Sequence, residues 1–444
     1  MAFNTNYLST SIKSIPDIEN LRWNHSEPKQ PHRSVFSKDR DRILYSKSFL
    51  RLRGKTQVFM LQKNDYIRTR MTHSLEVNQL AKTIAAALGL NIELTEAIAL
   101  GHDVGHTPFG HIGERAIAKM LEEDGNIPVS EKGFKHNLQA LRLLCELEKG
   151  ADYPHHNGLN LTKYTLWGIS HHSSIKEKKD EATGLPLVPI QTEHPIYDTY
   201  LQAIDSYWSF EGYIVALADE IAQRHHDIED SLLYGIISRK DLLTQISLFR
   251  GEFSSAEKKC FYRLQNELDT LADPVFNSLF ARLVVNLYVT SAIAKTKENM
   301  KELGLKYRIT RQEDFRNNKS TIPEIEYKGI VSLKPELQQL DNDFHNYLKS
   351  NVLSSFQAQA MDGKAEYIVR RLYKAFCDNP TQLPDTALCS FSGFAGLPLT
   401  RNDALQHLDE NKNLLHRCIA DYIGGMTDQF AYDEFDRLYG TKVF

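Results

Sequence analysis

The sequence predicts a mainly α-helical protein with little β structure, because apolar residues recur at helical spacing in most long segments and strand-like patterns are few. The clearest example is residues 72–90, THSLEVNQLAKTIAAALGL. Leu75, Leu80, Ile84 and Leu88 form an apolar stripe there, and Gly89 is the residue type that most often caps a helix at its C-terminus. We therefore expect an amphipathic helix that ends just before Gly89.

Further helices follow along the chain. Residues 93–103, ELTEAIALGHD, read as a second helix that is broken at Gly105 and Pro108, because proline cannot continue a helical hydrogen-bond ladder. A third helix begins near Gly110 and directs Ile117, Met120 and Leu121 inward. Additional helices are expected over residues 135–148, 209–230 and 282–300.

A chain of 444 residues can bury a large core and has room for two or three domains. We divide it into an N-terminal extension over residues 1–38, a helical core over residues 39–240 that carries the chemistry, and a helical C-terminal region over residues 241–444 that packs on the core.

Composition and charge argue against several classes of protein. The net charge of −4 does not favour a nucleic-acid-binding surface, although such binding is not excluded by it. The N-terminus lacks the order of a signal peptide, and no apolar run approaches the roughly 20 residues that span a bilayer. The five cysteines are scattered without a CxxC pair, which argues against disulfides and a thiolate zinc site. These features predict a cytoplasmic protein without a membrane partner.

One segment departs from this acidic background. Between Lys38 and Arg70 the chain has ten Lys or Arg and three Asp, a net charge of about +7. A solvated face of N-terminal helices would explain this excess. A pocket for a multiply charged anion would explain it equally well, and both interpretations stay open on the pattern alone.

Histidine is concentrated in one part of the chain. Nine of the seventeen histidines fall between His73 and His172, and the densest stretch is residues 101–114, GHDVGHTPFGHIGE. His102 and Asp103 end an apolar helix, where their burial needs a reason, whereas a His-Asp pair alone is weak evidence. His111 and Glu114 are spaced i,i+3 and share a helix face. This composition suits metal binding and proton transfer, and capping or surface histidines are the alternative.

A second polar residue stands where apolar ones are expected. Asp219 lies in YIVALADEIA, a helix that is apolar on nearly every side. A lone buried carboxylate costs several kcal/mol unless it is paired or bound to a metal. An ion pair with an arginine is the other explanation for Asp219, and His73, which follows RTRMT, can equally be a capping residue.

Together these residues resemble the HD-domain hydrolases, whose pattern is H…HD…D on a helical bundle. The stretches DRDRILYSKSFLRLRGKTQVF with RTRMTHSLEV, and HDVGHTPFGHIGE with GFKHNLQALR, narrow the resemblance to the dGTPase-like deoxynucleoside triphosphate triphosphohydrolases. The later stretches ALADEIAQRHHDIED, YIVRRLYKAFCDNPTQLP and DYIGGMTDQFA follow in that family's order. The resemblance covers residues 39–431 or so and implies an HD-domain helical bundle with a helical C-terminal region.

The resemblance implies a role for each matching position. The metal ligands are His73, His102, Asp103 and Asp219, which suit one divalent ion, Mn²⁺, Mg²⁺ or Fe²⁺. The catalytic residues are His111 and Glu114, a dyad in which the carboxylate orients the imidazole, and His136. The substrate-binding residues are Arg70 for phosphate, Gln57 and Val58 for sugar and base, and Asp227 near the 3′-hydroxyl, with Arg51, Arg53 and Lys55 as further phosphate neighbours.

Three departures from the family pattern bear on specificity. Gln223 stands where relatives carry an aromatic residue near the sugar, Leu50-Arg51 where they carry Arg-Arg, and Gln429-Phe430 where they carry Arg-Tyr. None alters a proposed metal ligand, so hydrolysis is expected to persist. Gln223 is smaller than a ring and can hydrogen-bond a hydroxyl, which predicts a weakened preference for the deoxy sugar.

The function implied is metal-dependent hydrolysis of deoxynucleoside triphosphates, dGTP included, to deoxynucleoside and triphosphate by attack of water on the α-phosphorus. The alternatives are an HD-type phosphodiesterase or alarmone hydrolase, which would not need the KTQV segment or the FKHN histidine, and a nucleotide-sensing protein. The resemblance also implies a homo-oligomer, and it allows an allosteric nucleotide as a further partner.

Overall fold

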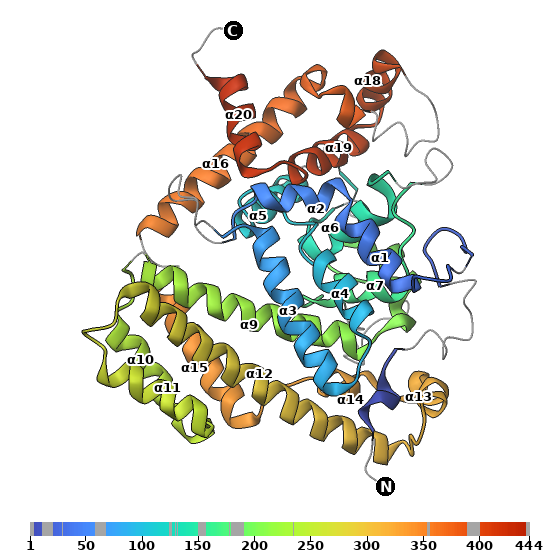
Figure 1. Ribbon diagram of the computed structural model, residues 1–444. Coiled ribbons are helices and arrows are strands. Elements are labelled where there is room, and N and C mark those ends of the chain that lie inside the picture. Colours follow the sequence, from blue (N-terminus) through green and yellow to red (C-terminus); the bar gives the residue numbers. More distant parts are fainter. Residues whose placement is uncertain are drawn as a thin grey trace. The chain divides into compact units, whose positions relative to one another are not determined.

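A computed structural model shows a mainly α-helical protein, as the sequence predicts (Figure 1). It describes residues 4–10, 21–28, 30–57, 68–123, 127–128, 130, 132–149, 157–176, 178, 191–233, 235–352, 356–388 and 400–440. Within these ranges there is no β-strand, and extended segments meet only in isolated bridges such as Thr56 with Thr69.

The chain forms two compact units, each assembled from separate segments. Unit 1 comprises residues 1–15, 76–95 and 213–360, and unit 2 comprises residues 16–75, 96–212 and 361–444. The chain passes from one unit to the other within four helices, α3 (Arg70–Leu88), α4 (Ile92–Gly101), α9 (Phe210–Leu233) and α16 (Phe356–Asp378). These interleaved units do not test the predicted division into residues 1–38, 39–240 and 241–444, which stays a prediction.

Unit 2 contains the histidine-rich segment. Its other elements are α1 (Val35–Leu44), α2 (Lys47–Arg51), η3 (Leu52–Gly54), α5 (His111–Glu123), α6 (His136–Arg142), a π-helical turn η5 (Leu143–Leu147), α7 (Lys163–His171), η6 (Pro195–Tyr197), α8 (Asp198–Ile204), η7 (Asp205–Tyr207), η10 (Pro380–Gln382), α18 (Arg401–Glu410), α19 (Lys412–Gly424) and α20 (Asp428–Tyr439). Helix α6 packs on α7, and α5 packs on α19.

The core of unit 2 is built around α5. Ile117 and Leu121 are buried on its inner face with Met120 beside them, as predicted, while Lys119 and Glu123 face solvent. The cluster that they join includes Leu372 of α16 and Ile419 of α19. This apolar packing anchors the helix that begins at His111, and so fixes where the polar first turn of α5 lies.

Unit 1 contains the remaining helices. They are η1 (Thr5–Leu8), α10 (Arg239–Ser247), η8 (Arg250–Glu252), α11 (Ser255–Asn266), α12 (Asp273–Lys306), α13 (Gln312–Asn318), η9 (Lys319–Thr321), α14 (Glu324–Lys328) and α15 (Pro335–Val352). Helix α11 packs along α12, and Asp341 of α15 accepts hydrogen bonds from Arg224 and from the hydroxyl of Tyr288. That buried ion pair holds α9, α12 and α15 together.

Two expectations need correction. Leu75 is about half exposed; the buried face of α3 runs through Leu88, Ile84, Ala81 and Val77 to His73, so the helical stripe ends on an imidazole. By length and composition α12 does pass as a membrane span, contrary to the expectation that no segment does. Half of its apolar window is buried within the protein, and one such helix among the described residues is weak evidence for a span.

Candidate active site

The turn between α4 and α5 sets the geometry of the candidate site. Phe109 and Gly110 both have left-handed backbone, with φ of 62° and 61°, which ends the turn and starts α5 at His111. Gly105 touches α6 so closely that a Cβ atom there would lie 2.0 Å from the His136 carbonyl oxygen. Only glycine permits this approach, and it allows the rings of His106 and His136 to stack at 3.9 Å between centroids.

Three predicted metal ligands come together in unit 2. The ligand atoms of His73, His102 and Asp103 all lie within 4.8 Å of one another, and all three side chains are buried. His102 donates from Nδ1 to the Ala99 carbonyl at 2.7 Å, which leaves Nε2 as the atom with a lone pair for an ion. This donor set of two imidazoles and a carboxylate fits a divalent ion.

Asp103 is held between a guanidinium and an imidazole. Arg70 Nη1 donates to its Oδ2 at 3.0 Å, and His106 Nε2 lies 3.0 Å from its Oδ1. Burial alone would raise the pKa of Asp103, but the contacts with His106, Arg70 and His102 outweigh it and hold that pKa well below its usual range. Asp103 is therefore an ionised carboxylate at neutral pH, as a metal ligand must be.

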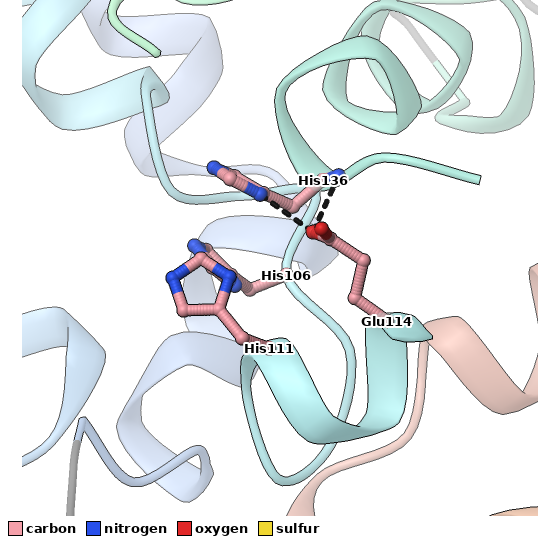
Figure 2. Close-up of side chains that lie close together, drawn as sticks. All are labelled: His106, His111, Glu114 and His136. Atoms are coloured by element: carbon pink, nitrogen blue, oxygen red, sulfur yellow. Dashed lines mark hydrogen bonds and ion pairs between the residues drawn. The ribbon is translucent and has the colours of Figure 1, made fainter. Parts of the chain in front are cut away.

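The second polar cluster lies beside the first and is shown in Figure 2. The ligand atoms of His106, His111, Glu114 and His136 lie within 4.8 Å of one another. Glu114 Oε2 accepts from the backbone nitrogen of His136 at 2.9 Å and from its Nδ1 at 2.6 Å. The carboxylate expected to orient His111 thus orients His136, while the ring of His111 stands edge-on to those of His106 and His136.

Burial and charge give these groups different protonation states. Partial desolvation by the surrounding protein, followed by the neighbouring His136 and Arg70, lowers the pKa of His111 to about 4, although His111 is exposed at the surface. Burial opposes ionisation of Glu114, but its hydrogen bond with His136 lowers its pKa to about 2. At neutral pH His111 is uncharged and able to accept a proton, and Glu114 is an anion that fixes the ring beside it.

The predicted residues of α9 belong to unit 1. Asp219 is buried, Gln223 is exposed and Asp227 is partly buried. Their i, i+4 and i+8 spacing places them along one face of the helix. Burial raises the pKa of Asp227 to about 7, against the opposing effect of Arg224. The fourth metal ligand and the two sugar contacts stay predictions.

The KTQV segment is only partly as expected. Gln57 is bound to Arg68 through its backbone, and within the described residues its buried Oε1 has no hydrogen-bond partner. Val58 lies outside the described residues. Lys55 was expected beside phosphate, but its buried ammonium donates to the carbonyls of His106 and Gly424, and burial lowers its pKa to about 7.

Much of the basic segment is used internally. Lys38 and Arg42 pair with Glu27, and Arg40 pairs with Asp41 and Glu96. A cavity of about 1010 Å³ in unit 2 is nevertheless lined by four basic residues of the segment, Lys38, Arg42, Lys47 and Arg51, with Arg142 and Arg417 among its other cationic side chains. Part of the segment therefore faces one cavity, although Lys38 and Arg42 there also pair with Glu27.

Two residues of the site were missed by sequence reasoning. The ring of His172 lies 5.0 Å from that of His102 and 5.4 Å from that of His136, between the two clusters. Asp428, at the start of α20, accepts from Thr56 through Oδ2 and from the Phe109 nitrogen through Oδ1 at 2.9 Å. His172 was visible only as part of the histidine excess, and Asp428 lies 319 residues from its partner.

Comparison with known proteins finds two matching family models and several similar proteins. Residues 70–222 match the family described as HD domain, and residues 331–437 match the phosphohydrolase-associated domain. A deoxyguanosinetriphosphate triphosphohydrolase-like protein of Geobacter metallireducens is 34% identical over 417 residues, which cover 94% of this chain and 91% of the relative. One from Bartonella tribocorum is 32% identical over 444 residues, covering 98% and 97% of the two chains.

The link between α20 and the turn before α5 leads to a first prediction. Asp428→Asn should lower the free energy of unfolding by about 1–3 kcal/mol, because an amide cannot accept on both sides and leaves a buried N–H unsatisfied. Urea unfolding measures this. Asp433→Asn, an exposed change on the same helix, is the control, and equal stability of the two variants would contradict the assignment.

The Glu114–His136 contact predicts a pH-dependent stability. The pKa of Glu114 falls from 4.5 to about 2 on folding, so its ionisation contributes about 3 kcal/mol above pH 4.5, a contribution lost as the pH falls through about 2. Glu114→Gln should therefore be less stable than the unmodified protein at pH 7, with the gap narrowing at pH 4 and pH 3 in urea unfolding. A gap independent of pH would refute the assignment.

Proposed function

Because the chain belongs to the deoxyguanosinetriphosphate triphosphohydrolase-like family of HD-domain proteins, we propose that it hydrolyses deoxynucleoside triphosphates, dGTP among them, to a deoxynucleoside and inorganic triphosphate. The family supports nucleotide triphosphohydrolase activity in general. The observation that carries the proposal is the contact between Asp103 and His106, which joins a metal-ligand cluster to a proton-transfer cluster.

The proposed cofactor is one divalent ion, Mn²⁺, Mg²⁺ or Fe²⁺. His73, His102 and Asp103 would hold it, with Asp219 as the fourth ligand by resemblance. Two imidazoles with carboxylates form a borderline-to-hard donor set that suits these ions. An ion held by these residues would supply positive charge to neutralise phosphate oxygens and to make water more acidic.

The protein's own groups would act on the phosphate and on two protons. Arg70 lies against the turn before His111. A Cβ atom added to Gly110 in that turn would be only 2.7 Å from Nη2 of Arg70. From there its guanidinium would neutralise charge on α-phosphate oxygens. His111, uncharged at neutral pH, would carry one of the protons that leave the water or reach the 5′-oxygen, and Glu114 would hold His136 in place beside it.

The sugar and base would be recognised by separate elements. The buried Oε1 of Gln57 is available to a ligand, and with Val58 it would line the sugar and base pocket. Asp227 would bind the 3′-hydroxyl. Gln223, in place of a ring, would leave room for a 2′-hydroxyl, so discrimination against GTP would be weaker than in relatives that carry the ring.

The proposed partners are a second copy of the chain and an activating nucleotide, both by resemblance, and the proposed compartment is the cytoplasm. The cavity lined by Arg51, Arg142 and Arg417 is large enough for a nucleoside triphosphate, and cationic side chains in its wall outnumber the acidic Asp41, Glu148 and Asp421. An HD-type phosphodiesterase or alarmone hydrolase would keep the metal ligands, but the similarity along nearly the whole chain favours the triphosphohydrolase.

Product analysis tests this function. The protein with Mn²⁺, Mg²⁺ or Fe²⁺ should convert dGTP to deoxyguanosine and triphosphate, resolved by chromatography, and the other dNTPs and GTP measure its selectivity. Asp103→Ala should lose both bound metal and turnover, because a ligand is removed. Release of pyrophosphate or of single phosphates, or turnover of cyclic nucleotides in preference to dNTPs, would refute the proposal.

The role of His111 has a distinct test. His111→Ala should keep its metal and bind dGTP but turn over about 10²–10⁴-fold more slowly, the usual contribution of one positioned proton-transfer group. Elemental analysis and single-turnover kinetics measure the two properties. Loss of metal from His111→Ala would make His111 a ligand instead, and unchanged turnover would remove it from the chemistry.

A further inference from the structure

A third group of metal-ligating side chains lies in unit 1, apart from both clusters described above. It consists of Glu76 on α3 and the consecutive pair His225 and His226 on α9, whose ligand atoms all lie within 4.8 Å of one another. Glu229, one turn further along α9, lies beside it with its Oε1 3.2 Å from His225 Nε2. We propose that these residues form a second, non-catalytic site for a divalent transition-metal ion of the Zn²⁺ class.

The geometry of α9 makes this convergence unusual. Consecutive helix residues project about 100° apart, so two adjacent imidazoles do not normally meet one carboxylate. Here both do: His226 Nε2 is hydrogen-bonded to Glu76 Oε2, and His225 Nδ1 lies 3.7 Å from the same oxygen. Glu76 therefore lies between the two rings, where it would share an ion with them.

The donor set fits a borderline transition metal. Two imidazole nitrogens and the Glu76 carboxylate are ligands that Zn²⁺ accepts, with bonds of about 2.0–2.2 Å, while Glu229 contacts the opposite nitrogen of the His225 ring and would orient it. Tetrahedral ligands at that bond length lie about 3.4 Å apart. The 3.7 Å between His225 Nδ1 and Glu76 Oε2 is close to this value, and all the ligand atoms lie within 4.8 Å of one another, so small shifts of the side chains would form the site. The absence of a thiolate in the group argues against a soft ion.

Burial and charge favour a cation at this position. The His226 side chain is only 1% exposed, whereas those of Glu76 and Glu229 are 36% and 31% exposed, so the site is closed on one side and open to ions on the other. The carboxylates of Glu76 and Glu229 place negative charge beside the two imidazoles, which favours a divalent cation there.

Such an ion would be connected to the proposed active site through helices α3 and α9, which carry residues of both. Glu76 lies one turn after His73 on α3, and His226 precedes Asp227 on α9. A metal bridging Glu76 to His225 and His226 would fix these two helices at positions adjacent to a proposed catalytic ligand and a proposed sugar contact. The ion would thus have a structural role and no contact with phosphate.

Equilibrium dialysis of the full-length protein against Zn²⁺, followed by elemental analysis, tests the site. The Asp103→Ala background removes the proposed catalytic site, so the two ions are counted separately. We expect Asp103→Ala to retain close to one equivalent of Zn²⁺ and the additional changes Glu76→Gln and His225→Asn to weaken that binding by at least tenfold. His407→Asn with Glu410→Gln, a matched pair of changes on α18, should have no effect.

Two further measurements distinguish loss of the metal site from loss of the folded structure. Circular dichroism in EDTA shows whether the Glu76→Gln, His225→Asn protein is folded, and Glu229→Gln, a milder change, should weaken Zn²⁺ binding without loss of structure. Equal Zn²⁺ binding by Asp103→Ala with and without the changes at Glu76 and His225 would overturn the proposal. That result would not affect the proposed hydrolysis, because hydrolysis depends on the metal that Asp103 binds, and Asp103→Ala tests that metal separately.

Discussion

The candidate site depends on a buried carboxylate that stays ionised. Asp103 is almost wholly removed from water, and an isolated charge there would be neutralised by a rise in its pKa. Arg70 from α3 and His106 from the following turn prevent this by binding its two oxygens. The same contacts tie the start of α3 to the turn between α4 and α5. The stability of this region and the readiness of the site for a cation therefore have a common electrostatic cause.

Helical periodicity predicted most of the fold, because it reports on which side of a helix is buried. It located α3, α4, α5 and α9 to within a few residues, and Gly89 adopts the left-handed conformation, φ 71°, that a helix C-cap requires. It failed at Leu75, which is apolar but lies off the face through Val77 and His73. The buried face of α3 continues from Val77 to the imidazole of His73, and a rule that counts only apolar residues does not include His73.

The sequence identified the residues of the candidate site more completely than it identified the contacts between them. His102, Asp103, His111 and Glu114 are close in sequence, so their clustering follows from local geometry. The pairing of Glu114 with His136 does not, since the two residues are 22 positions apart and their contact depends on how α6 packs against Gly105. Lys55 shows the same limit, because its charge predicted phosphate binding while its burial directs the ammonium to backbone carbonyls.

The contact of Asp428 with Phe109 has a consequence for how the protein is made. The strained left-handed turn before His111 is completed by a carboxylate near residue 430, and α19 supplies the carbonyl of Gly424 that Lys55 binds. On a ribosome the histidine-rich segment emerges some three hundred residues earlier than these partners. The nascent polypeptide would therefore form its first helices before the turn that precedes His111 is fixed, and that turn would be completed only after residues 424–428 have been synthesised.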